Sequence, residues 1–272
     1  MNPFKSYSYS CNEEKTFEFI FPRQKEETKI VTFGDWSDCA NGKASLNYLL
    51  KNIEKYDSAI ILGDLAYDLY TDNGKMGNNF MEFIYAFTTK IPFMNTAGNH
   101  ETKNHYEDYI ERFNLPLKKE NKNLFYSFDI NDAHFVTLPS DFAIGENKTA
   151  KEEIEKMLTW LERDLKATNK KWKIVYMHRP LYCSDYSKET CTKESEELRN
   201  TFEDLFYQNK VDLVLAGHLH NYERLMPVYN AEADLKATEE NENVYDSPKF
   251  PVYLICGAVG NSNGEHKKCI LF

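Results

Sequence analysis

The amino-acid sequence predicts an α/β fold with an at least partly parallel sheet, because short apolar runs alternate with longer helical patterns along the chain. Most of the runs are apolar almost throughout, as expected of strands that are buried on both faces. They cover residues 29–33, 58–62, 92–97, 173–177, 211–216 and 251–256. Two further runs, 124–130 and 133–138, meet at Asn131-Asp132, a dipeptide that favours a two-residue hairpin turn. We expect these segments to be the strands.

Three segments between the runs have the apolar periodicity of amphipathic helices. Residues 43–56, 149–167 and 193–209 each place apolar side chains on one face, namely Leu46, Leu49, Leu50 and Ile53, then Ile154, Leu158, Leu161 and Leu165, and finally Leu198, Phe202, Leu205 and Phe206. We interpret these stripes as core. Outside this pattern, residues 17–21 predict one short strand with no partner nearby, and the acidic segment 230–249 predicts a loop.

The composition is that of a globular protein, since 42% of the 272 residues are apolar and 14% are aromatic. The net charge is −10, with 43 acidic against 33 basic residues, which argues against nucleic acid or an anionic membrane as a partner. No apolar run approaches the roughly 20 residues that a membrane span needs. A small phosphorylated substrate remains compatible with the charge, because bound metal ions reverse the local field.

Side chains that can bind metals follow five of the predicted strands, and in four cases a glycine comes first. The segments are Gly34-Asp35, Gly63-Asp64 with Tyr67, Gly98-Asn99-His100, His178, and Gly217-His218-Leu219-His220. Each alone is a weak signal, since Gly-Asp is usually a turn and a lone histidine is usually a loop residue. In an α/β sheet, however, ligands bind at the carboxyl ends of the strands, and glycine allows close backbone approach there. The full set therefore predicts a metal site.

Taken in order, these segments resemble the motifs of the purple acid phosphatases, within the calcineurin-like metallophosphoesterases. The matching motifs are Gly34-Asp35, Gly63-Asp64-Leu65-Ala66-Tyr67, Gly98-Asn99-His100-Glu101, Val175-Tyr176-Met177-His178 and Gly217-His218-Leu219-His220. The flanking residues 178–183 and 220–229 look like the long, two-domain branch of that family. The resemblance covers roughly residues 29–262. It implies a four-layer αββα sandwich of the metallophosphoesterase type with two mixed central sheets.

The resemblance also implies seven metal ligands for a ferric ion and one divalent ion, which would be zinc, manganese or iron. The ferric ligands would be Asp35, Asp64, Tyr67 and His220, and the divalent ligands Asp64, Asn99, His178 and His218, with Asp64 bridging. Donor chemistry agrees, because carboxylate and phenolate suit a highly charged cation and imidazole suits softer divalent ions. A free tyrosine has a pKa near ~10, so Tyr67 would ligate only beside a strong Lewis acid. Related phosphoesterases have a histidine where Ser37 stands, and Tyr67 would take over its role.

By the same resemblance, the chain is expected to be an acid phosphatase. It would hydrolyse phosphate monoesters by attack of a metal-bound hydroxide at a dinuclear Fe(III)–M(II) centre. His100, beside the ligand Asn99, is the candidate that protonates the leaving group. The sequence does not decide whether the substrate also contacts Arg179, Tyr182 or Tyr222. Three further histidines, His105, His134 and His266, match no motif and are predicted to be structural or surface residues.

Two other readings stay open. The chain could be another calcineurin-like phosphoesterase, such as a phosphodiesterase or nucleotidase, in which case it would lack a charge-transfer colour and tolerate Tyr67→Phe. Alternatively it could be a truncated, non-catalytic pseudo-phosphatase. Neither the physiological substrate, the divalent metal nor the oligomeric state follows from the sequence.

The long branch of the family carries an N-terminal β-sandwich like fibronectin type III. Residues 1–28 are expected to be its remnant and linker, and 29–272 a catalytic domain shortened at its C-terminus. The resemblance implies secretion or a vacuolar or lysosomal location. The first residues lack the apolar core of a signal peptide, so the chain is either cytosolic or lacks its true N-terminus. Cys183 and Cys191 flank a polar turn that suits a disulfide, and Asn147-Lys148-Thr149 is a glycosylation sequon.

Overall fold

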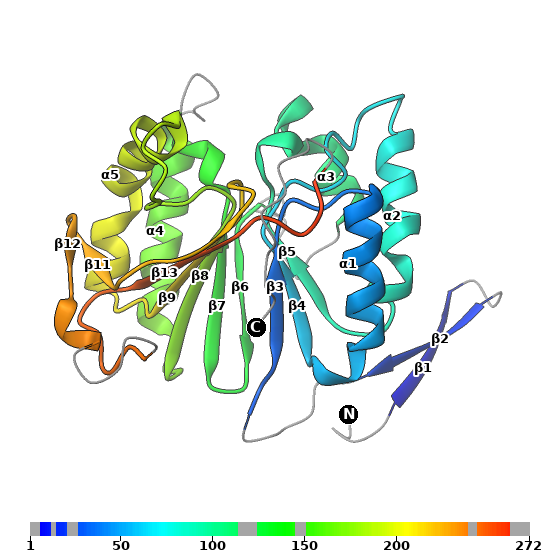
Figure 1. Ribbon diagram of the computed structural model, residues 1–272, viewed down its shortest axis with the longest axis horizontal. Helices are drawn as coiled ribbons and strands as arrows, with labels where there is room; N and C mark the ends of the chain where they lie inside the picture. The colour runs from blue at the N-terminus through cyan, green and yellow to red at the C-terminus, as the bar shows by residue number, and fades with distance from the viewer. Residues whose placement is uncertain are drawn as a thin grey trace.

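The computed structural model describes residues 6–11, 15–20, 27–113, 124–144, 151–238 and 244–261. Two central sheets lie face to face, and helices cover the outer face of each, which gives four layers (Figure 1). The smaller sheet has the order β3-β4-β5 and the larger the order β10-β13-β9-β8-β7-β6. The predicted α/β four-layer fold is confirmed.

The strands of the smaller sheet are β3 (Ile30–Phe33), β4 (Ser58–Ile61) and β5 (Phe93–Asn95), and these described strands pair in parallel. The larger sheet is mixed. Its strands are β6 (Tyr126–Ile130), β7 (Ala133–Leu138), β8 (Trp172–Met177), β9 (Leu213–Ala216), β10 (Tyr222–Arg224) and β13 (Val252–Cys256). Strands β7, β8, β9 and β13 run parallel, while the edge strands β6 and β10 are antiparallel to their neighbours. The β6–β7 hairpin turns at Asn131 with φ of 49°, as the dipeptide predicts.

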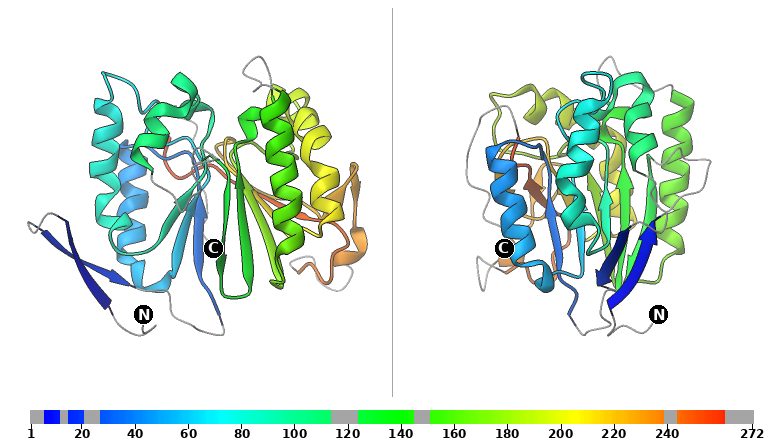
Figure 2. Two further views of the ribbon diagram at one scale, coloured as in Figure 1. Left: turned by 180° about the vertical axis from the view of Figure 1, so that it is seen from behind. Right: turned by 90° about the vertical axis from the view of Figure 1, so that its right-hand side faces the viewer.

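The helices are α1 (Ala40–Lys51), α2 (Lys75–Thr88), α3 (Glu107–Arg112), α4 (Lys151–Ala167) and α5 (Lys193–Gln208). Helices α1, α4 and α5 match the predicted segments, although the end of the first is a 3-10 turn, Ile53–Lys55. Helix α2 was not predicted. It buries Phe80, Ile84 and Phe87 on one face, but Gly77 and the neighbouring asparagines lower its intrinsic helix propensity. Figure 2, which views the molecule from behind and from the side, shows that helices cover the outer face of both sheets.

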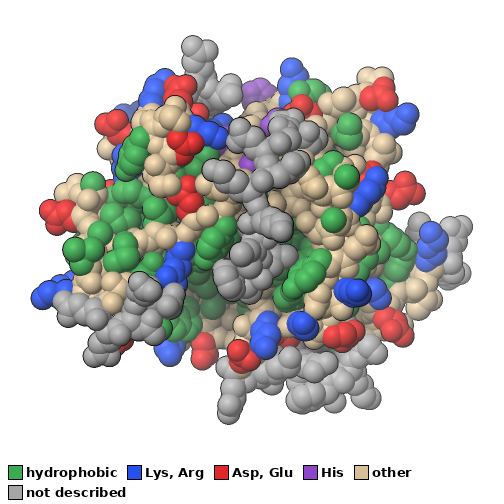
Figure 3. All heavy atoms as spheres, in the orientation of Figure 1, with side chains coloured by type: hydrophobic (Ala, Val, Ile, Leu, Met, Phe, Trp, Pro, Cys, Tyr) green, Lys and Arg blue, Asp and Glu red, His purple; other side chains and the backbone are tan. Residues whose placement is uncertain are grey.

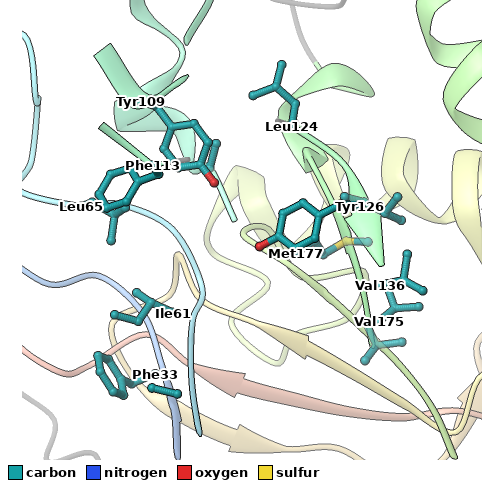
Figure 4. Packing of buried hydrophobic residues seen from close by; sticks show 14 of the residues in the cluster. Phe33, Ile61, Leu65, Tyr109, Phe113, Leu124, Tyr126, Val136, Val175 and Met177 are labelled. Carbon is teal, nitrogen blue, oxygen red and sulfur yellow. The ribbon is translucent and has the colours of Figure 1, made fainter. Parts of the chain in front are cut away.

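Strand alternation divides the core into an outer and an inner layer. Figure 4 shows part of the outer packing, with Phe33 and Ile61 from the smaller sheet and Val136 and Val175 from the larger. The inner layer lies between the sheets and contains Ile60, Leu62, Phe135, Tyr176, Leu215 and Cys256. Because successive strand residues point to opposite faces, one strand such as β4 contributes to both layers. The inner layer therefore holds the two sheets in a fixed relation.

The N-terminal region corrects one expectation. The strand predicted at 17–21 without a partner is β2 (Lys15–Ile20), and it pairs antiparallel with β1 (Ser6–Cys11). Pairing satisfies backbone groups that a lone strand would leave exposed, and the alternating Ser-Tyr run supplies the second strand. The hairpin lies beside α2, where Phe17 contacts Tyr85 edge-on at 5.5 Å (Figure 1). Its relation to a β-sandwich domain stays a prediction.

The segment predicted as a loop at 230–249 contains short elements where it is described. They are β12 (Glu232–Ala233), which pairs with β11 (Val228–Tyr229), and the 3-10 turn Leu235–Thr238. The sequence left open whether Cys183 and Cys191 are bonded, and the structure joins them in a disulfide with Cα atoms 5.3 Å apart. The sequon at 147–149 and His266 lie outside the described residues. Within the described segments, no helix combines the length and apolar character that crossing a bilayer requires.

Candidate metal centre

The seven candidate ligands lie at the carboxyl ends of β3, β4, β5, β8 and β9. Three of these strands belong to the smaller sheet and two to the larger, so both sheets contribute to one site. In Figure 3, histidine side chains reach the surface at the upper end of the molecule, between the two halves. The structure therefore brings together residues that are up to 185 positions apart, Asp35 and His220 being the outermost.

One group of donor atoms comes from Asp35, Tyr67 and His220. The Tyr67 hydroxyl lies 2.8 Å from His220 Nε2 and 3.4 Å from Asp35 Oδ1. His220 Nε2 is 3.3 Å from the same Asp35 oxygen. The three atoms thus form a compact triangle of two oxygens and one nitrogen.

A second group comes from Asp64, Asn99, His178 and His218. His178 Nε2 is central, at 3.2 Å from Asp64 Oδ2, 3.1 Å from Asn99 Oδ1 and 3.2 Å from His218 Nδ1. The donor atoms of Asp64, His178 and His218 all lie within 4.8 Å of one another. Neighbouring ligands of a cation at about 2.1 Å are roughly 3 Å apart, so the spacing in both groups fits bound cations.

The backbone at the site is strained. Four of the candidate ligands, Asp35, Asp64, Tyr67 and His218, have φ between 52° and 66°, a region that non-glycine residues rarely adopt. Each such residue costs on the order of 1–3 kcal/mol and persists only when its surroundings require it. The turns that follow the strands therefore hold these four donor residues in a conformation that they would rarely adopt by themselves.

Two glycines show why the motifs contain this residue. A Cβ atom on Gly98 would lie 2.3 Å from Asp64 Oδ1 and 2.9 Å from the His178 ring. Gly63 has φ of 84°, and a Cβ there would lie 2.7 Å from His178 Nδ1. The turns after β4 and β5 can approach His178 this closely only because Gly63 and Gly98 have no side chain.

Comparison with known proteins agrees with this geometry. The family model described as calcineurin-like phosphoesterase matches residues 28–222. This chain belongs to the calcineurin-like phosphoesterases. It is 31% identical to acid phosphatase type 7 of Mus musculus, over 96% of this chain and 62% of the relative. It is 30% identical to probable purple acid phosphatase 20 of Arabidopsis thaliana, over 97% of this chain and 60% of that protein.

The fold of this calcineurin-like phosphoesterase is also that of a solved purple acid phosphatase from yellow lupin seeds. The two structures superimpose with a TM-score of 0.72 at 20% identity, over 94% of this chain and 49% of the lupin chain. The resemblance to purple acid phosphatases is thereby confirmed. The chain spans about three fifths of the length of the two curated relatives named above.

Charge in the second donor group is arranged for a cation. Burial lowers the pKa of His178, but the adjacent Asp64 carboxylate raises it overall to about 10. Burial acts to raise the pKa of Asp64, and the charged His178 instead lowers it below its usual value. The buried Asp64 carboxylate thus favours positive charge at the neighbouring donor, where a cation would have the same neighbours.

In the first donor group, burial and neighbouring carboxylates favour the protonated forms of the side chains. Burial and the carboxylates of Asp35 and Asp64 raise the pKa of Tyr67 above that of free tyrosine. Burial also raises the pKa of Asp35. The Asp64 charge acts in the same direction on both residues.

The proposed acid His100 lies beside the ligands and has a partner that the motif analysis did not identify. Its Nδ1 is 2.8 Å from Asp68 Oδ1, and its Nε2 is 3.9 Å from Asp64 Oδ2. Its backbone N–H donates to Asp64 Oδ1 at 3.1 Å. Asp68 directly follows the motif residue Tyr67 in the sequence. An acidic side chain at that position is the feature of the sequence that could have identified it as a partner for a histidine.

Glu101 belongs to the third motif, and the sequence alone assigns it no role. Its buried carboxylate accepts hydrogen bonds from the backbone N–H groups of Asp64, Leu65 and Gly98 at 2.7–2.9 Å. Burial and the Asp64 charge raise the pKa of Glu101 to about 8, while the Gly98 and Leu65 donors oppose the rise. Glu101 therefore ties the turn after β4 to the turn after β5.

The other residues that the sequence singled out lie outside the two donor groups. The Ser37 hydroxyl donates to the Gly260 carbonyl at 3.0 Å. The Tyr182 hydroxyl donates to Glu203 of α5, which anchors it to that helix. Tyr222 belongs to β10 and is 37% exposed. His134 is buried between two carboxylates, with Nδ1 2.7 Å from Asp129 Oδ1 and Nε2 2.9 Å from Asp164 Oδ2, in agreement with a structural role. His105 has a left-handed backbone conformation with φ of 56°.

Proposed function

We propose that this chain is an acid phosphatase that hydrolyses phosphate monoesters at a centre of two cations. The observation that carries the proposal is the pair of donor groups described above, each with atoms about 3 Å apart. Similarity to acid phosphatase type 7 and to purple acid phosphatases supports it.

Asp35, Tyr67 and His220 would hold a ferric ion, while Asn99, His178 and His218 would hold a divalent one, namely zinc, manganese or iron. The Asp64 carboxylate would belong to both. Oxygen-rich donors suit the harder ion and imidazoles the softer one. When bound, the two cations would neutralise charge on a phosphoryl group and activate water for attack on phosphorus.

The residues around the cations would bind and protonate the substrate. Asp68 accepts from His100 Nδ1, so Nε2 is the ring nitrogen that faces the site. His100 in its imidazolium form would donate the Nε2 proton to the leaving alkoxide. The substrate would be small and phosphorylated, and the acidic chain, with its net charge of −10, would avoid nucleic acids.

We also propose that the protein works in an oxidising compartment, either secreted or in a vacuolar or lysosomal lumen. The Cys183–Cys191 disulfide supports this location, since such bonds persist where glutathione does not reduce them.

The test is metal analysis and a visible spectrum of the purified chain, with rates on a nitrophenyl monoester and the matching diester at acid pH. We expect two metals per chain, a charge-transfer band that is lost in Tyr67→Phe, and preference for the monoester. Asp64→Asn should lose both metals and slow turnover by about 100- to 1,000-fold, whereas Asp72→Asn, an exposed control, should not.

Other results would favour the alternatives. A colourless metalloprotein that prefers the diester and tolerates Tyr67→Phe would be a different calcineurin-like phosphoesterase. A chain that binds metals without hydrolysing either ester would be non-catalytic. A chain that binds none would refute the metal centre itself.

A further inference from the structure

His218 presents its two ring nitrogens to different surroundings. Nδ1 faces the candidate metal ligands and is 3.2 Å from His178 Nε2. Nε2 points away from them, to Arg179 Nη1 at 2.8 Å and Thr190 Oγ1 at 3.1 Å. Neither Arg179 nor Thr190 belongs to the predicted ligand set.

These two residues share a third partner, Glu194, at the start of α5. Glu194 Oε2 accepts from Thr190 Oγ1 at 2.8 Å and from Arg179 Nη1 at 2.7 Å. Arg179 is further held by Asp141, whose Oδ1 accepts from Nε at 2.9 Å. The Arg179 side chain is 12% exposed and Glu194 24% exposed, so the network is largely shielded from water.

Hydrogen-bond polarity limits how this network can be used. A guanidinium only donates, so in the present arrangement His218 Nε2 accepts from Arg179. A neutral imidazole that binds a cation through Nδ1 carries its proton on Nε2 instead. Nε2–H and the Arg179 N–H would then be two donors facing each other. Among the residues that the structure describes, Thr190 Oγ1 is the one placed to accept from Nε2–H, because its own proton is directed to Glu194.

We propose that Thr190 and Glu194 are positioning residues for His218 in the cation-loaded protein. Nε2–H of His218 donates to the Thr190 hydroxyl, the hydroxyl donates to Glu194, and Arg179 moves off Nε2 while keeping Asp141 and Glu194. The relay fixes both the tautomer and the orientation of the ring, so that Nδ1 faces the cation. This inference rests on the proposed metal centre.

The disulfide explains how Thr190 reaches this place. Thr190 precedes Cys191, which is bonded to Cys183, five residues after the candidate ligand His178. Ser195 strengthens the same turn, since its hydroxyl donates to the Thr190 carbonyl at 2.6 Å. A side chain 28 positions before His218 is thereby held against its outer nitrogen.

The test measures divalent affinity of the full chain by competition with a chromogenic chelator, using Zn²⁺ alone and then Mn²⁺ alone. Removal of a hydrogen-bond partner of a histidine ligand typically costs 10- to 100-fold in metal affinity. We expect a loss of about that size in Thr190→Val and in Glu194→Gln, with recovery in Thr190→Ser. Thr192→Val, two positions away on the same turn and exposed, is the matched control and should bind like the wild type.

A second readout distinguishes positioning from general damage. Nitrogen-15 NMR of the histidine rings in the Zn²⁺-loaded protein should show His218 protonated on Nε2, with an added population of the other tautomer in Thr190→Val. The proposal is overturned if Thr190→Val and Glu194→Gln bind both ions like the wild type, or if loaded His218 carries its proton on Nδ1. A wild-type chain that binds neither ion would instead refute the metal centre on which the inference rests.

Discussion

The two halves of the molecule supply different chemistry to the same site. The smaller sheet and its turns contribute oxygen donors, from Asp35, Asp64, Tyr67 and Asn99, whereas the larger sheet contributes the imidazoles of His178, His218 and His220. Yet each donor group draws on both halves. Tyr67 meets His220 in one, and Asp64 meets His178 in the other.

This difference shows that neither half holds a site alone. The donors meet because the apolar inner layer fixes one sheet against the other. Bound cations would act as a second link across the same junction, since each would have ligands in both halves. The stability of the junction and the binding of cations should therefore depend on each other.

The largest expected effect is that of cation removal on stability. With cations at 100 to 1,000 times their dissociation constant, binding to the folded state alone adds about 3–4 kcal/mol to the free energy of unfolding. Urea unfolding with and without a chelator measures this difference. Asp64→Asn should be less stable than the loaded wild type and should not respond to the chelator. Equal stability of the wild type with and without the chelator would show that bound cations do not link the two halves.

Truncation within the inner layer should weaken both stability and the site. Leu62 is fully buried between the sheets, and Leu62→Ala should lower the free energy of unfolding by about 2–4 kcal/mol. Leu49→Ala, an equally buried change under α1 on the outer side of the smaller sheet, should cost a similar amount. Only Leu62→Ala should also weaken Zn²⁺ binding in the chelator assay. A loss of affinity in both variants, or in neither, would contradict the linking role of the inner layer.

A smaller effect should separate the acid from the ligands within one half. Asp68→Asn removes the carboxylate that holds His100 Nδ1, and should slow hydrolysis of an alkyl phosphate by about 10- to 100-fold. A nitrophenyl ester, whose leaving group needs no proton, should be hydrolysed at nearly the wild-type rate. Equal slowing of both esters would show that Asp68 acts on the centre as a whole. Asp72→Asn serves as the exposed control.

The smallest expected effect on stability concerns His134, which lies on β7 of the larger sheet. Burial lowers the pKa of His134, but hydrogen bonds to Asp164 and Asp129 raise it overall above its usual value. The stability from this group is therefore present below a pH of about 6.5 and is lost as the pH rises through the folded-state pKa. His134→Gln should cost about 1–2 kcal/mol at pH 5.5 and less at pH 9, as measured by urea unfolding. A cost that does not fall with pH would show that the charge on His134 is unimportant.

Much of the architecture could be predicted because strand and helix patterns are local. Runs such as 173–177 and the stripe of α5 depend on neighbouring residues only, and the structure contains both. Helix α2 was missed although Phe80, Ile84 and Phe87 carry its buried stripe. The hairpin at the N-terminus was missed because its first strand is mostly serine and tyrosine, which read as polar.

The partners of the candidate residues were much less predictable. Asp68 adjoins a motif, and its type could have identified it as a partner for His100. Thr190 and Glu194 match no motif, and they reach His218 only because a turn closed by a disulfide lies against the end of β9. The contact between Thr190 and His218 spans 28 positions, so no sequence period records it.

The sequence by itself determined which donor types are present, their order, and their place at the ends of strands, because these depend on side-chain chemistry and on short-range periodicity. The tertiary structure alone decided which sheet delivers which donors, which residues outside the motifs contact them, and which nitrogen of His218 faces the ligands. Those outcomes depend on how two apolar faces pack together, and packing is a property of the whole chain.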